Sequence, residues 1–113
     1  MTPNEYQKAC LRTEPMDAKI SHTTRLENGL MGLNGEAGEA IDILKKFLFQ
    51  GHELDKEHLA KELGDVAWYL AVTADALGYD LETIFEMNVE KLRARYPDGF
   101  DPYLSIHRRD GDI

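Results

Sequence analysis

Residues 56–77 read KEHLAKELGDVAWYLAVTADAL. Apolar side chains recur there every three or four residues, which is the spacing of one face of an α-helix. Asp55 supplies an N-cap, and Gly78 supplies a stop signal. Because Trp68 and Ala71 lie opposite the apolar stripe, we expect a partner subunit to cover that side of the helix. The stripe itself predicts a core-facing surface, made of Leu59, Leu63, Val66, Leu70, Ala74 and Leu77.

A second long helix is predicted upstream, from about residue 24 to Phe49. It begins with a capping box at Thr24, and Gly51 ends it. Its apolar residues also form one stripe, which we expect to lie in the core. They are Leu26, Leu30, Leu33, Ala37, Ile41, Leu44 and Leu48.

Two further helices flank this pair. Thr2 opens a capping box with a proline at the first helical position, which predicts a helix over about 2–13. A loop is expected over 14–22, and Asp80 caps a last helix over about 81–96. No segment alternates in the manner of a strand, so the sequence predicts an all-α bundle of about four helices.

Size and charge limit the classes of function. The chain has 113 residues and a mass of 12.9 kDa, which fits one domain over 1–100 followed by an irregular tail over 101–113. Its net charge of −8 argues against duplex nucleic acid as a partner. No apolar run is long enough for a membrane span, and a lone Cys10 excludes an internal disulfide. We therefore expect a cytoplasmic protein.

Two pairs of acids interrupt rows of small and apolar residues beside the predicted core stripes. Glu36 and Glu39 are three residues apart, as are Glu62 and Asp65, so each pair shares a helix face. If the helices pack antiparallel, the four carboxylates converge, and a hard divalent cation would relieve their repulsion. Oxygen-only ligands suit Mg²⁺, with Mn²⁺ as a substitute. Because acids are common on helices, a solvated face remains an alternative at this point.

The last predicted helix places an amide and two cations on one face: Asn88, Lys91 and Arg95. Beside a metal site, such groups suit phosphate oxygens. The alternative is that Lys91 and Arg95 extend from the edge of the core into solvent. None of the four histidines has a Ser or Cys partner in a recognisable motif, and the lack of Glu-x-x-His pairs disfavours a di-iron bundle.

The acid pairs resemble a family signature. Glu36-x-x-Glu39, followed after 22 intervening residues by Glu62-x-x-Asp65, is similar to the E-x-x-E…E-x-x-D pattern of the MazG-like nucleotide pyrophosphohydrolases. The surrounding segments 32–39, 61–70 and 88–100 fit the family as well, so the resemblance covers about residues 4–100.

The resemblance implies an all-α enzyme whose active unit is completed by dimerisation, as a homodimer or a dimer of dimers. It implies Mg²⁺ held by Glu36, Glu39, Glu62 and Asp65. It also implies hydrolysis of nucleoside or deoxynucleoside triphosphates to the monophosphate and pyrophosphate, a reaction suited to nucleotide-pool house-cleaning. Phosphate or sugar contacts would come from Asn88, Lys91 and Arg95. Glu39 is our candidate for the carboxylate that accepts a proton from the attacking water.

Two other classes of function remain open from the sequence. A catalytically weak nucleotide-binding or regulatory module would keep the same residues, whereas a helical interaction protein would not need the four acids. The base and sugar preference, the number of metal ions, and the choice between dimer and tetramer are also open.

Overall fold

The computed structural model describes residues 1–15 and 21–113. Within these residues the chain forms five helices and no strand, which confirms the all-α prediction. No helix among them is both long enough and apolar enough to cross a bilayer. The helices are α1 (Pro3–Leu11), α2 (His22–Phe49), α3 (Lys56–Leu77), α4 (Leu81–Arg95) and α5 (Pro102–Ile106).

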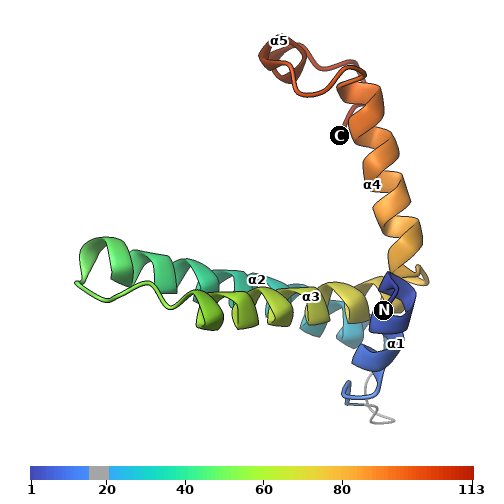
Figure 1. Ribbon diagram of the computed structural model, residues 1–113. Coiled ribbons are helices and arrows are strands. Elements are labelled where there is room, and N and C mark those ends of the chain that lie inside the picture. Colours follow the sequence, from blue (N-terminus) through green and yellow to red (C-terminus); the bar gives the residue numbers. More distant parts are fainter. Residues whose placement is uncertain (16–20) are drawn as a thin grey trace.

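The molecule has the shape of an L (Figure 1). Helices α2 and α3 lie antiparallel and form one limb, which we call the hairpin. Helix α1 packs near the end of the hairpin where α3 finishes, and α4 leaves that corner at a steep angle with α5 at its far end. We call residues 81–113 the arm. The radius of gyration is 17.4 Å, whereas a compact domain of this length has about 13 Å.

Most of the predicted helix ends are observed. Thr2, Asp55 and Asp80 are N-caps whose side chains accept a hydrogen bond from the backbone three residues on. The second helix differs from the prediction, because Ser21 rather than Thr24 caps it. Part of the predicted 14–22 loop lies outside the described residues. The tail also differs: Pro102–Ile106 forms a short helix after an Asp101 cap, where the sequence predicted irregular structure.

The core lies at the corner of the L rather than along the hairpin. It consists of Cys10, Ala71, Val72, Ala74 and Leu81, all 3% exposed or less. Trp68 packs against this cluster, and its indole N–H donates to Thr13 Oγ1 at 2.8 Å. The side of α3 for which we expected a partner subunit is therefore covered by α1 and the residues that follow it.

The apolar stripe that we expected in the core is largely exposed on α2, so that expectation is wrong for this helix in a single chain, whereas on α3 Ala74 lies in the core and Leu70 packs against it. Leu30 is 58% exposed, Ile41 66% and Leu63 59%. The neighbouring row packs between the helices instead. A Cβ on Gly29 would overlap the Thr73 side chain, and a Cβ on Gly32 would overlap the Tyr69 ring. Missing side chains at these two positions let α2 and α3 approach closely.

Polar side chains of α1 hold the corner between α3 and α4. The buried Gln7 amide donates to the carbonyls of Ala71 and Tyr79, both at 3.1 Å, and its oxygen accepts from Leu81 N at 3.2 Å. These bonds tie the C-terminal part of α3 and the turn after it to the first N–H of α4, which has no partner within its own helix. Helix α1 therefore helps to set the direction in which the arm leaves the hairpin.

A second polar cluster joins the N-terminal segment to the hairpin. Arg25 of α2 donates to Glu14 at 2.7 Å and to Asp75 of α3 at 2.8 Å. The Glu14 side chain is only 4% exposed. The pKa of Arg25 is raised by its hydrogen bonds to Glu14 and Asp75. This cluster matches one buried acid with one cation, so its role is structural.

Candidate metal centre

Three of the four predicted acids meet between the helices of the hairpin. Glu36 comes from α2, and Glu62 and Asp65 come from α3. One carboxylate oxygen from each lies within 4.8 Å of the others. The close approach of α2 and α3 at Gly29 and Gly32 places Glu36 against the two acids of α3. Helices α2 and α3 pack antiparallel, as the predicted convergence of the acids requires.

The cluster has negative charge that the described part of the chain does not balance. Glu62 is 8% exposed, and its Oε2 has no hydrogen-bond partner among the described residues. Within the same residues, no lysine or arginine forms an ion pair with Glu36, Glu62 or Asp65. A buried carboxylate oxygen without a partner costs free energy until a proton or a cation reaches it.

Desolvation raises the pKa of Glu36 above its ordinary value. The neighbouring Glu62 carboxylate and the charges of Asp65 and Glu39 raise it further. Crowded carboxylates take up a proton or bind a cation. A set of oxygen ligands without sulfur fits a hard divalent cation such as Mg²⁺ or Mn²⁺. The donor set therefore fits the ion that the sequence implied.

The fourth acid, Glu39, lies outside this group. It is exposed and lines a neighbouring pocket of about 460 Å³ together with Glu62 and His58. Its charge still raises the pKa of Glu36. Glu39 is thus close to the cluster without being one of its three acids.

Sequence reasoning missed His58. Its Nε2 lies 3.1 Å from Oε1 of Glu62, one helical turn away on α3. The histidine fixes one oxygen of Glu62 and leaves the other without a partner. The signal in the sequence was the spacing of four residues between His58 and Glu62, which puts both on one helix face.

Tyr6 of α1 contacts the segment of α3 that carries two of the acids. Its hydroxyl donates to the carbonyl of Gly64 at 3.4 Å. Burial, followed by interactions with Cys10 and with the charge of Asp65, raises the pKa of Tyr6 to about 12. The phenol therefore remains protonated at neutral pH and acts as a hydrogen-bond donor rather than as a base.

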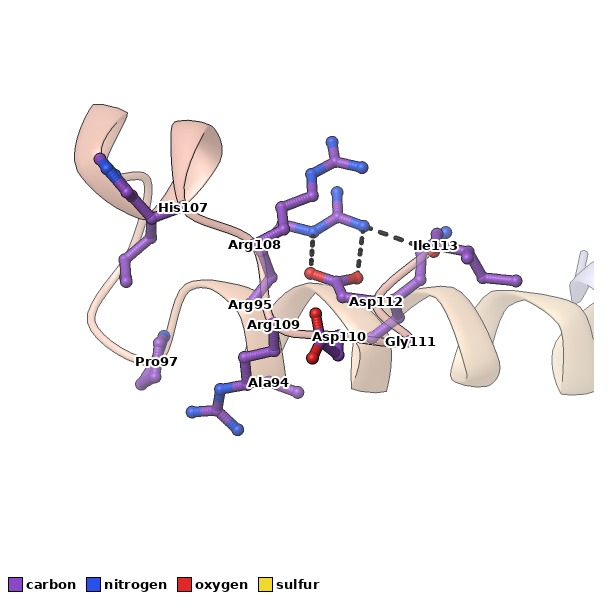
Figure 2. Close-up of a pocket in the computed structure, with 12 residues that line it drawn as sticks. Ala94, Arg95, Pro97, His107, Arg108, Arg109, Asp110, Gly111, Asp112 and Ile113 are labelled. Carbon is purple, nitrogen blue, oxygen red and sulfur yellow. Dashed lines mark hydrogen bonds and ion pairs between the residues drawn. The ribbon is translucent and has the colours of Figure 1, made fainter.

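The structure does not bring the predicted phosphate ligands to the acids within one chain. Asn88, Lys91 and Arg95 belong to α4, which leads away from the hairpin (Figure 1). Lys91 and Arg95 line a pocket near the end of the arm. Figure 2 shows Arg95 held by Asp112: Nε and Nη2 of the arginine donate to the carboxylate at 2.9 and 2.7 Å.

Comparison with known proteins found a matching family. The MazG nucleotide pyrophosphohydrolase domain matches residues 25–100, which include the acid cluster. The chain is also similar to the Gene 37 protein of Mycobacterium phage L5, with 40% identity over 73 residues. That alignment covers 61% of this chain and 64% of the relative, so the chain spans less than two thirds of the relative's length. No solved structure matches. Since the matched domain includes both long helices, the acids between them and α4, the chain belongs to the MazG nucleotide pyrophosphohydrolase family.

Proposed function

We propose that the protein hydrolyses nucleoside or deoxynucleoside triphosphates to the monophosphate and pyrophosphate in the presence of Mg²⁺. The observation that supports this most strongly is the Glu62 carboxylate, which is buried among acids with one oxygen left without a partner. A helical interaction protein would gain nothing from this arrangement, because it costs stability without a cation. Nucleotide-pool house-cleaning in the cytoplasm is the role that fits such an activity.

Glu36, Glu62 and Asp65 would hold the ion, with Glu39 as a further ligand or as the base. Mg²⁺ would supply positive charge that offsets the triphosphate and the developing charge of the transition state. In the reaction, a water oxygen bonds to the α-phosphorus while the bond to the bridging α–β oxygen breaks. Pyrophosphate leaves with that electron pair, and Glu39 accepts the proton of the water. Glu39 lies outside the cluster of Glu36, Glu62 and Asp65, which leaves its carboxylate available for that proton.

A second copy of the chain would complete the active unit. The accessible surface is 8528 Å², whereas a monomer of this mass has roughly 6,300 Å². The excess of about 2,200 Å² is what one subunit of an obligate dimer loses on assembly. The exposed hairpin stripe, which includes Leu30, Ile41 and Leu63, is the apolar surface that a second copy would cover. In such a dimer, Asn88, Lys91 and Arg95 of one copy would bind phosphates at the acids of the other.

A substrate panel tests the activity directly. Purified protein is incubated with standard, deoxy and modified nucleoside triphosphates in Mg²⁺, and pyrophosphate and orthophosphate are measured separately. We expect pyrophosphate from at least one substrate and none after chelation. Orthophosphate as the sole product would refute the cleavage position. Metal-dependent binding without turnover across the panel would favour the regulatory module.

Light scattering tests the assembly. At micromolar concentration we expect a mass of at least two chains. A mass near the 12.9 kDa of one chain would refute the dimer.

A further inference from the structure

His58 holds one oxygen of the buried Glu62 carboxylate. Its Nε2 lies 3.1 Å from Oε1 of Glu62, whereas Oε2 has no partner among the described residues. The His58 side chain is 55% exposed and the Glu62 side chain 10%. Both line the pocket of about 460 Å³ that also includes Glu39. The histidine thus lies at the border between solvent and the buried acid.

The start of α3 fixes the backbone that carries this ring. Asp55 is the N-cap, and its carboxylate accepts from the backbone N–H of His58 at 3.0 Å. A glutamate side chain has several rotatable bonds and loses much conformational entropy when it is held in one position. Because the hydrogen bond from His58 already holds Glu62, part of that cost is removed from the binding of a cation.

A histidine treats the acid differently from an arginine. Arg25 pairs with the buried Glu14 at 2.7 Å and brings a full positive charge to it. An imidazole with its proton on Nε2 donates a hydrogen bond to Oε1 of Glu62 and leaves the negative charge on the carboxylate. That charge remains available to a cation at the acid cluster. Carboxylates that bind metal ions are typically held by outer hydrogen bonds of this kind.

We propose that His58 is a positioning residue for the metal centre: its hydrogen bond to Oε1 orients the Glu62 carboxylate and directs Oε2 to the cation. His58 is not itself a ligand of the ion. This inference rests on the metal centre of the proposed function, but it concerns affinity for the ion rather than hydrolysis. Loss of an outer partner of a metal ligand lowers metal affinity about 10–100-fold.

Binding of Mn²⁺ to the full, metal-free chain tests this role, because Mn²⁺ suits the same oxygen ligands and gives a paramagnetic resonance signal. His58→Ala should weaken Mn²⁺ binding about tenfold or more. Alanine is a strong helix former, so this variant should stay folded, which circular dichroism checks. His58→Gln should keep most of the affinity, because the glutamine amide also donates a hydrogen bond. His52→Ala is the matched control: this histidine is exposed, lies between α2 and α3, and should leave binding unchanged.

Equal affinity in the wild type and His58→Ala would overturn the positioning role. A loss in His58→Gln as large as that in His58→Ala would also overturn it. So would a nitrogen coupling in the pulsed resonance spectrum of bound Mn²⁺ that disappears in His58→Gln, because His58 would then be a ligand.

The same titrations separate this proposal from the proposed function. If the wild type binds no Mn²⁺, the metal centre fails, and both proposals fail with it. If the wild type binds Mn²⁺ with the expected dependence on His58 but hydrolyses no triphosphate, the proposed function fails and the role of His58 stands.

Discussion

The hairpin and the arm each hold a charged side chain that is largely withdrawn from solvent, but they balance its charge differently. In the hairpin, Glu62 is 8% exposed and one of its oxygens has no partner among the described residues. In the arm, the Arg95 side chain is 10% exposed and two of its nitrogens donate to Asp112. The first arrangement leaves a buried carboxylate oxygen without a partner, whereas the second pairs its cation with a carboxylate of the same chain. Burial alone would have classed the two residues together.

A third charged cluster shows what a purely structural arrangement looks like. Arg25 lies between Glu14 and Asp75, and the buried acid has its cation at 2.7 Å. Mutation should therefore change stability differently at the three clusters, and the following experiments use that difference.

Glu62→Gln should have the largest effect. It removes an anionic ligand, so activity and Mg²⁺ binding should be lost. Without metal the same change relieves repulsion, so the melting temperature should be unchanged or higher. The measurement is a set of thermal melts with and without Mg²⁺, alongside activity. Glu57 is an exposed residue on the same helix that pairs with Lys61. As the control, Glu57→Gln should change neither the activity nor the melting temperature.

If the Glu62 variant melts markedly lower without metal, and Mg²⁺ stabilises both proteins equally, then Glu62 is structural. The contrast between the hairpin and the arm would then fail.

Arg25→Gln should lower the free energy of unfolding by about 3 kcal/mol, because it leaves the buried Glu14 without its cation. Urea denaturation measures the loss. Lys45→Gln breaks an exposed pair with Asp42 and should cost less than about 1 kcal/mol. Equal losses in the two variants would mean that burial of the ion pair is not the deciding factor.

Gly32→Ala should cost about 1–3 kcal/mol, because the new methyl group overlaps the Tyr69 ring and separates α2 from α3. The same displacement moves Glu36 away from Glu62, so Mg²⁺ affinity should fall as well. Gly64→Ala serves as the control: nothing lies within 4 Å of its Cβ, and the gain in helix propensity should stabilise the chain by about 1 kcal/mol or less. Unchanged metal affinity in Gly32→Ala would separate the acid cluster from the close packing.

The smallest effect concerns pH at the arm. Because Arg95 lowers the pKa of Asp112, the ion pair stabilises the docked tail above the ordinary pKa of an aspartate. That stabilisation is lost only as pH falls through the lowered value. An NMR titration of the Asp112 resonances should therefore give a midpoint below about 3.9. In Arg95→Gln the midpoint should return toward that value; a midpoint that stays low would mean that other groups hold the carboxylate.

The sequence predicted the helices well because the signals for their ends are local. Asp55 and Asp80 bond to their own helices, so no distant contact is needed to recognise them. Ser21 was missed because Thr24, three residues later, also fits the start of a capping box.

Packing was harder to predict, because a hydrophobic stripe does not say what covers it. The Leu30 and Ile41 stripe is exposed, while Gly29 and Gly32, which contribute no apolar side chain, form the contact between the helices. The acids were found because their spacing is local on each helix, and their meeting followed from the antiparallel arrangement. Asp112 could not have been paired with Arg95, since the two are 17 residues apart and no local rule joins them.

The only cysteine of the chain gives the corner of the L a built-in chemical reporter. Cys10 is 3% exposed and lies in the cluster that joins α1 to α3 and α4. Because Cys10 is buried, a thiol reagent reaches it only after the cluster opens, so the rate of labelling reports how often the corner opens. Opening of the corner can thus be timed in the unmodified protein. A ligand bound to the hairpin or to the arm that slows this rate stabilises the closed state of the corner.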